Sequence, residues 1–154
     1  MALFYQQALD ANWDLLAGFT TDIKPAPGRH WLSVGLKGLA PWFLETRSVL
    51  HFGEAGRVAL NVEIEKEILL TQDWMLLPGL ELNVYAQNDF ATGHGSGISD
   101  AVLGLYMVRR ANRKLMPYIG IQESRKFGKT AEYALKNGDI VSDTQWLIGV
   151  KAWY

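Results

Sequence analysis

Three carboxylates recur at every second residue in the segment 57–68. Glu63, Glu65 and Glu67 alternate there with mostly apolar side chains. A period of two places alternate side chains on opposite faces of a β-strand, whereas a helical period would spread these carboxylates around a cylinder. We therefore interpret the segment as a strand whose polar face carries a column of negative charge. Such a column attracts cations, either basic side chains or metal ions.

Other segments also carry charged side chains on the face opposite their apolar stripe. Together with the three glutamates, these residues are Asp14, Lys37, Glu45, Arg47, Glu81 and Lys151. Because both signs of charge are present, we expect the set to form a paired network on one side of a sheet. The alternative is that the carboxylates hold or guide a cation that is not part of the chain.

The same alternation runs through most of the chain. We expect strands over residues 2–9, 13–20, 32–37, 42–52, 57–68, 80–87, 99–109, 118–126 and 145–154. Short links near 11–12, 40–41, 71–73 and 111–113 alternate with longer segments at 23–29, 88–97 and 128–143, apart from a tight link at 53–56. This pattern is typical of an antiparallel meander with two distinct ends.

The number of strands bears on whether the sheet can close. About nine strands are expected, whereas a closed antiparallel meander needs an even number. Either residues 2–9 lie outside the barrel, or sequence before residue 1 supplies at least one more strand. The predicted fold is all-β: an antiparallel up-and-down transmembrane β-barrel of about 8–10 strands. Residues 1–154 are expected to form this barrel as a single domain.

Composition narrows the class of protein. Aromatic residues make up 12% of the chain, with six Trp and six Tyr, and membrane proteins concentrate such residues at their interfaces. No apolar run reaches the roughly 18 residues of a transmembrane helix, so the chain can cross a membrane only with strands. A net charge of −1 argues against a nucleic-acid partner. The first residues lack signal-peptide features, so we expect a mature, truncated or non-exported chain.

Alternation alone does not say which face points inward. A soluble barrel places its apolar side chains inside, and a membrane barrel places them outside. Trp13, Trp42 and Trp74 follow short links, and the final Tyr154 is expected near the same end. These positions resemble an interfacial girdle and favour the membrane barrel. The alternative is a soluble barrel with one end plugged by Trp; Lys66, on the apolar face, fits a membrane only if it reaches an interface.

Short strings spaced along nearly the whole chain resemble one family. They are Trp13-Asp14-Leu15, Ala17-Gly18, Gly38-Leu39-Ala40-Pro41-Trp42-Phe43, Leu69-Leu70-Thr71-Gln72, Pro78-Gly79-Leu80-Glu81-Leu82-Asn83, Gly95-Ser96-Gly97-Ile98-Ser99-Asp100, Pro117-Tyr118-Ile119-Gly120, Arg125-Lys126-Phe127-Gly128 and Val141-Ser142-Asp143-Thr144. Their order and spacing are similar to the barrel portion of the copper resistance protein B family of Gram-negative outer membranes.

This resemblance implies a non-enzymatic outer-membrane barrel, in contact with outer-membrane lipid, that takes part in copper resistance and copper ion handling. The Met- and His-rich N-terminal region usual in the family has no counterpart in the sequence. Residues 149–154 also resemble the C-terminal signal that the outer-membrane assembly machinery reads, with Ala152 where a larger apolar residue is preferred.

The resemblance directs attention to side chains that could bind copper. Soft Cu(I) prefers thioether ligands and also accepts imidazole. Met75 and Met116, near short links, and His51 and His94, toward the longer loops, are the candidate copper ligands. None of them is spaced as a motif. Ordinary packing of the methionines and exposed loop positions of the histidines are therefore the alternatives.

Two other functions are compatible with parts of the sequence. A small structural or pore-forming outer-membrane barrel with no metal role is the main alternative. A hydrolase or acyltransferase that uses His94 with Ser96 or Ser99 and Asp100 is disfavoured, because proximity in sequence does not make a nucleophile and a base converge.

Overall fold

The computed structural model describes residues 2–22, 28–110 and 115–152. Its elements are β1 (Ala2–Ala8), β2 (Trp13–Asp22), β3 (Arg29–Ala40), η1 (Pro41–Phe43), β4 (Leu44–Gly53), η2 (Glu54–Gly56), β5 (Val58–Lys66), β6 (Ile68–Leu69), β7 (Trp74–Tyr85), β8 (Gly97–Arg109), β9 (Leu115–Lys126), α1 (Gly128–Lys136) and β10 (Ser142–Ala152). This confirms the predicted all-β antiparallel architecture.

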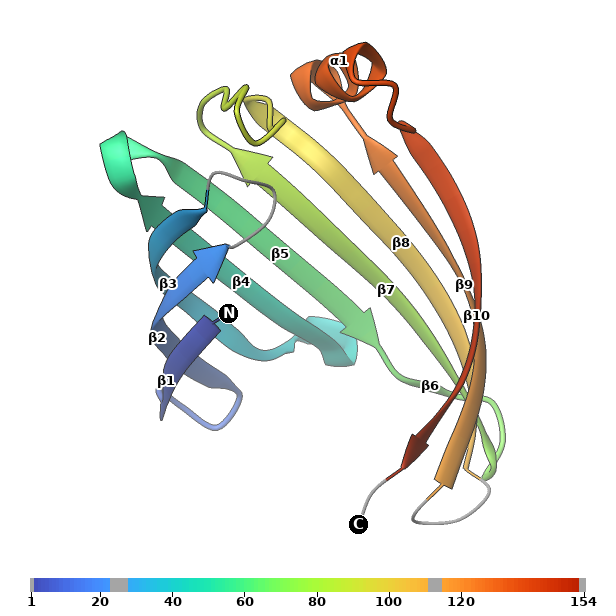
Figure 1. Ribbon diagram of the computed structural model, residues 1–154. Coiled ribbons are helices and arrows are strands. Elements are labelled where there is room, and N and C mark those ends of the chain that lie inside the picture. Colours follow the sequence, from blue (N-terminus) through green and yellow to red (C-terminus); the bar gives the residue numbers. More distant parts are fainter. Residues whose placement is uncertain (1, 23–27, 111–114, 153–154) are drawn as a thin grey trace.

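The strands form one antiparallel meander. Their order in the sheet is β1-β2-β3-β4-β5-β7-β8-β9-β10, and the two-residue β6 pairs with β7 off this path. Residues 2–8, whose place in the barrel the sequence left open, are the first strand of the sheet. The sheet curls so that β1 and β10 lie on opposite sides of its concave face (Figure 1).

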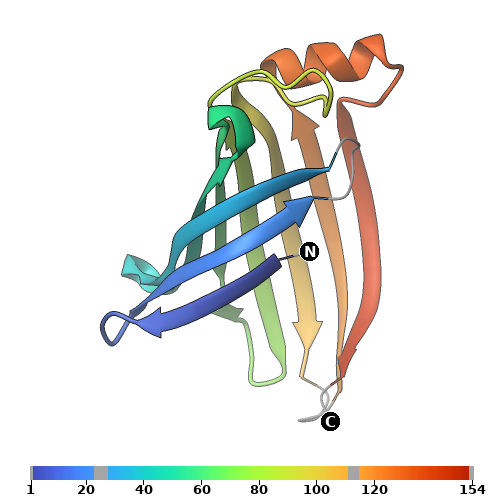
Figure 2. The same ribbon diagram turned by 60° about the vertical axis from the view of Figure 1, so that its left-hand side comes forward.

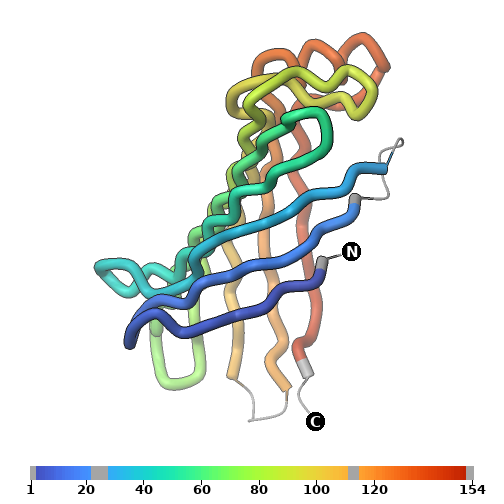
Figure 3. The backbone as a smooth tube through the Cα atoms, turned by 90° about the vertical axis from the view of Figure 1, so that its left-hand side faces the viewer, coloured from blue at the N-terminus to red at the C-terminus, as the bar shows by residue number. Residues whose placement is uncertain are grey.

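The two ends of the sheet differ as expected. The β1–β2 and β3–β4 connections are short and lie at the end where the chain turns tightly, whereas α1 and the 86–96 loop lie together at the other end (Figure 2). The tube view shows the same arrangement, with β1, β2 and β3 crossing in front of the other strands (Figure 3). The predicted link at 111–113 lies outside the described residues.

Apolar side chains cover the outer face of the sheet. Leu32, Leu103 and Ile148 are 65%, 60% and 83% exposed, and they alternate with inward-pointing residues on their strands. The inner face is defined here by the side chains that line the cavities of the concave side, including Arg47 and Glu63. Apolar residues outside and charges inside are the reverse of a soluble barrel and match a membrane barrel.

Two segments differ from the strands predicted for them. The strand predicted at 42–52 begins only at Leu44, because Trp42 and Phe43 form a tight turn with φ of 64° and 58°. Both rings are nearly four-fifths exposed at the short-turn end, where an aromatic girdle was expected. The strand predicted at 57–68 breaks after Lys66, which removes Glu67 from the column of Glu63 and Glu65.

Inner-face glycines give room to tyrosine rings on neighbouring strands. The Tyr106 ring lies against Gly120, so closely that an added Cβ would overlap its Cδ1 atom, and Tyr118 lies in the same way against Gly149. Aromatic rings packed over glycines are a recurrent way to fix register in curved sheets. Tyr106 and Tyr118 also contact each other edge to face, with ring centroids 6.2 Å apart.

The Gly120→Val variant tests this packing. We expect it to lower the free energy of unfolding by about 1–3 kcal/mol, because the tyrosine ring must move out of its site. Urea unfolding of the lipid-folded protein measures the change. Ser124→Val, on the same strand and face, is the control and should change little. If Gly120→Val remains equally destabilising after Tyr106→Leu removes the ring, the explanation is wrong.

Candidate functional site

A row of five charged residues crosses the inner face at one level. Strand register pairs Asp14 with Lys37, Lys37 with Arg47, Arg47 with Glu63, and Glu63 with Glu81. The two basic side chains on β3 and β4 are therefore flanked by carboxylates. Alternation on each strand and antiparallel register together bring these residues to the same height.

Arg47 anchors the centre of this row. Its Nη1 donates to Glu63 Oε1 at 2.9 Å, and its guanidinium lies 5.3 Å from the centre of the Phe4 ring. Both partners keep substantial contact with solvent, so the pair itself contributes little, on the order of 1 kcal/mol or less. Its role is to place a positive charge beside the carboxylate of Glu63.

Six of the nine charged residues predicted to form the network surround one cavity. The cavity has a volume of about 420 Å³, and its lining includes Asp14, Lys37, Glu45, Arg47, Glu63 and Glu65. Asp14 also accepts a hydrogen bond from Gln6 Nε2 at 2.7 Å. The sequence therefore predicted the face on which these charges lie. A dense network of ion pairs was expected, but among the described residues that line the cavity the ion pair is Arg47–Glu63.

Two of the nine predicted residues lie elsewhere. Glu67 follows the end of β5 and accepts a hydrogen bond from Arg110 Nη2 at 2.9 Å near the short turns, because the break after Lys66 takes it out of the strand alternation. Lys151 lines a separate cavity of about 310 Å³ with Glu65 and the two tyrosines.

Glu81, the ninth residue, joins a ladder of amides that sequence reasoning did not single out. Asn61 Nδ2 donates to Glu81 Oε1 at 3.3 Å and to Asn83 Oδ1 at 2.9 Å. Asn83 Nδ2 in turn donates to Asp100 Oδ2 at 2.8 Å. The signal was present, since all of these residues occupy polar positions of alternating strands. The ladder links three neighbouring strands, β5, β7 and β8, across the inner face.

The two candidate methionine ligands lie in one cluster. Met75 is 6% exposed and packs with Leu77 and Val108, and Met116 packs against the same cluster. Met75 Sδ also accepts a hydrogen bond from Arg110 Nη2 at 3.6 Å. The cluster lies near the short turns. It brings Met75 and Met116, which are 41 positions apart in the sequence, to one apolar site on the inner face.

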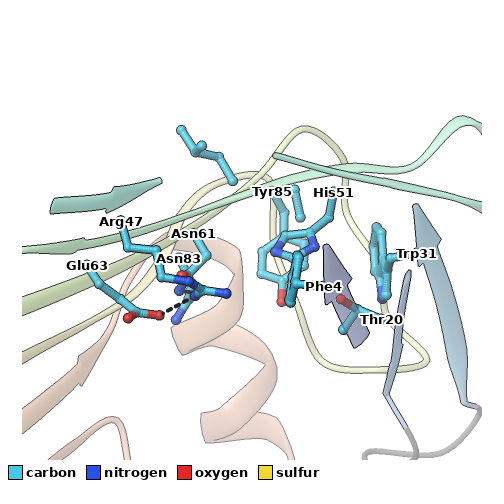
Figure 4. A pocket seen from close by; sticks show the side chains of 11 residues that line it. Phe4, Thr20, Trp31, Arg47, His51, Asn61, Glu63, Asn83 and Tyr85 are labelled. Carbon is cyan, nitrogen blue, oxygen red and sulfur yellow. Dashed lines mark hydrogen bonds and ion pairs between the residues drawn. The ribbon is translucent and has the colours of Figure 1, made fainter. Parts of the chain in front are cut away.

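His51 lines a pocket toward the loop end of the sheet. Its Nδ1 is 2.7 Å from the hydroxyl of Ser33, a side chain that is almost completely buried, and Ser33 is 3.1 Å from Thr20 Oγ1. Figure 4 shows His51 between Tyr85 and Trp31. The pocket has a volume of about 290 Å³ and extends from Phe4 on β1 to Tyr85 on β7.

His94 lies in the 86–96 loop rather than in the pocket. Its ring stacks on Tyr85 with centroids 4.4 Å apart, and its Nδ1 is 2.9 Å from Thr92 Oγ1. Ser99 is completely buried and bonds Thr130 on α1, whereas Asp100 accepts from Asn83. His94, Ser99 and Asp100, the residues of the disfavoured enzyme hypothesis, therefore each contact a different partner.

The candidate copper ligands thus fall into two groups at opposite ends of the inner face. Met75 and Met116 belong to one apolar cluster, whereas at the loop end His51 lines a pocket with Tyr85 and His94 stacks on the Tyr85 ring. Within the described ranges, no cluster of three or more His, Cys, Asp or Glu side chains could hold a metal ion.

The mostly buried carboxylate of Asp89 forms ion pairs with two arginines at the loop end of the sheet. Asp89 accepts hydrogen bonds from Arg29 Nε at 3.1 Å and Arg29 Nη2 at 3.2 Å, and it forms an ion pair with Arg57 Nε at 3.2 Å. Its side chain is 10% exposed. Burial alone would raise the pKa of Asp89, but hydrogen bonds from Arg29 and Thr92 and the charges of Arg29 and Arg57 outweigh it. The pKa therefore lies below its usual value of 3.8. The 86–96 loop is held to the starts of β3 and β5 by these ion pairs.

The chain is similar to known proteins over nearly its whole length. The family model described as copper resistance protein B precursor (CopB) matches residues 1–154. A copper resistance protein B homolog of Pseudomonas syringae pv. tomato (strain ATCC BAA-871 / DC3000) is 35% identical over 147 residues, covering 96% of this chain and 50% of that protein. The copper resistance protein B of Escherichia coli is 34% identical over 152 residues, covering 99% and 51%.

The chain thus spans about half the length of the curated relatives it matches. Among solved structures, the NanC porin in a rhombohedral crystal form is similar in fold, with a TM-score of 0.65 and 15% identity. That match covers 99% of this chain and 78% of the porin. No helix among the described residues is long and apolar enough to cross a membrane.

Proposed function

Because the chain belongs to the copper resistance protein B family, we propose that it forms the transmembrane barrel of a copper-tolerance protein in a Gram-negative outer membrane. The observation that carries this proposal is the reversed polarity of the sheet, with exposed apolar side chains outside and charges inside. We propose a non-enzymatic role, with outer-membrane lipid and the outer-membrane assembly machinery as partners. Fractionation of cells that produce the protein tests the location.

For the copper itself we propose Cu(I) as the form handled and the Met75–Met116 cluster as its contact. Two thioethers that pack on one apolar cluster, with Met75 buried and Met116 partly buried, suit a soft monovalent ion better than the carboxylate column does. The carboxylates of the inner face would act at longer range, because they attract cations without forming a dedicated copper site. His51 and His94 are second candidates, for copper that approaches from the loop end.

The copper proposal predicts a specific loss of binding. The detergent-folded protein is titrated with Cu(I) in the presence of a competing chelator, and separately with Cu(II). We expect Met75→Ala/Met116→Ala to weaken Cu(I) binding at least about tenfold, which corresponds to about 1.4 kcal/mol. Met107→Ala removes an outward-facing thioether of β8 and is the matched control, with no expected effect.

Each other result has a defined meaning. Equal Cu(I) binding in the double variant would move the site away from the methionine cluster, and loss in His51→Ala or His94→Ala would place it at the loop end. If the intact protein binds neither ion, this part of the chain is a membrane anchor or a structural or pore-forming barrel without a metal role. The inner-face cavities and the porin fold make that the second candidate function.

A further inference from the structure

The side chain of Arg110 lies against one of the two candidate methionine ligands. Arg110 directly follows β8, and its backbone amide donates to the carbonyl of Asp73 at 2.7 Å. The preceding residue, Arg109, lies on the outer face with its guanidinium 5.8 Å from the centre of the Trp74 ring. Strand alternation therefore turns Arg110 to the inner face, where it reaches Met75 on the neighbouring strand.

One nitrogen of Arg110 bridges a carboxylate and a thioether. Its Nη2 donates to Glu67 Oε1 at 2.9 Å and to Met75 Sδ at 3.6 Å. Met75 is buried, whereas the side chains of Arg110 and Glu67 are 45% and 44% exposed. An ion pair with this exposure is weak, so it does not fix the guanidinium in one position. The contact between Arg110 and the sulfur can therefore open.

This contact opposes the binding of a metal ion at the same sulfur. A thioether is a weak hydrogen-bond acceptor, and the lone pair that accepts from Arg110 is not available to a soft ion such as Cu(I). The guanidinium also repels a second positive charge, and this repulsion is stronger beside a buried sulfur than in water. Arg110 therefore lowers the affinity of Met75 for a cation while it stays in contact.

We propose that Arg110 is a latch on the copper contact of Met75 and Met116, an inference that rests on the methionine part of the proposed function. With the latch closed, Arg110 bridges Glu67 and Met75 and weakens Cu(I) binding. With the latch open, the guanidinium stays with Glu67, and the Met75 sulfur can bind the ion beside Met116. The latch lies near the short turns, which face the periplasm in bacterial barrels.

Two adjacent arginines provide a matched test. The detergent-folded protein is titrated with Cu(I) against a competing chelator. Arg110→Gln removes the charge, and we expect it to tighten Cu(I) binding about tenfold, which corresponds to about 1.4 kcal/mol. Arg109→Gln removes the same charge from the outer face and is the control, with no expected change. Arg110→Lys keeps the charge and should bind Cu(I) as the parent does.

A second readout needs no copper. Peroxide converts methionine to its sulfoxide at the sulfur atom, and peptide mass spectrometry measures the rate for each methionine. We expect Met75 to be oxidised faster in Arg110→Gln than in the parent or in Arg109→Gln. Met107, on the outer face, is the internal reference and should react at the same rate in all three proteins.

Three results would overturn the latch: unchanged Cu(I) affinity in Arg110→Gln, an equal gain in Arg109→Gln, or a gain without faster oxidation of Met75. Failure of the proposed function looks different. If Met75→Ala/Met116→Ala binds Cu(I) as tightly as the parent, the methionine contact is wrong and the latch is wrong with it. If that double variant loses binding and Arg110→Gln binds as the parent does, only the latch is wrong.

Discussion

Replacing Ile119 with Arg is expected to lower the free energy of unfolding in lipid vesicles by about 2–4 kcal/mol. Ile119 lies on the outer face of β9 and is 46% exposed. Its register partners are Met107 and Ile148, which are also apolar and exposed, so the new guanidinium would have no carboxylate beside it. The charge would have to stay in hydrocarbon or distort the bilayer to reach water.

The control is Gln122→Arg on the same strand. Gln122 faces inward and lines a cavity with Glu63, Glu65 and Glu81, where a cation gains favourable interactions. Urea-dependent folding into vesicles measures both variants. Similar stability of Ile119→Arg and the parent, or equal losses in the two variants, would mean that the outer face does not contact lipid.

The second large effect is expected at Asp89. Asp89→Asn removes the charge that two arginines share at the loop end, and breaking such a mostly buried pair leaves Arg29 and Arg57 without compensation. We expect local opening of the 86–96 loop to become easier by about 3 kcal/mol. Hydrogen exchange at the amides of Asp89 and His94, which pair with each other's carbonyls, should then accelerate about 100-fold.

The same ion pairs make the loop sensitive to acid. Because the pKa of Asp89 is lowered in the folded loop, the stabilisation is fully present above the ordinary value of 3.8 and is lost as the pH falls through the lower, folded-state value. At neutral pH the pairs are therefore intact. Glu132→Gln, which breaks only the exposed Lys129–Glu132 pair on α1, is the control. A loop whose exchange does not change in Asp89→Asn would contradict this account.

Period-two alternation predicted most of the sheet from sequence, because each strand has one face toward lipid and one toward the interior. It failed where backbone chemistry interrupts the pattern. Pro78 and Gly79 obscured the first half of β7, and Pro117 the start of β9, so both strands are longer than predicted. Helix α1 was expected as loop, since its nine residues form a helix too short to be stable alone. Thr130 contacts to Ser99 and Gly95 hold it.

The inner-face residues were easier to predict than their partners. Polarity and alternation indicate which side a residue such as Arg47 faces, and strand register then decides that Glu63 is its neighbour. Asp89 was missed because its partners, Arg29 at the start of β3 and Arg57 just before β5, are distant in sequence, and no local pattern encodes their approach. Glu67 was misplaced for a related reason, since nothing in the alternation marks the break after Lys66.

The row of charges across the inner face is not symmetric around the barrel. Lys37 and Arg47 lie on β3 and β4, whereas Glu63 and Glu81 lie on β5 and β7. At this depth the charge changes sign from the positive pair on β3 and β4 to the negative pair on β5 and β7, with Asp14 on β2 beyond the positive pair, so an electric field runs along the inner face. A solute with separated charges that reached this face would align its dipole with the field, so the face would favour one orientation of the solute as well as one net charge.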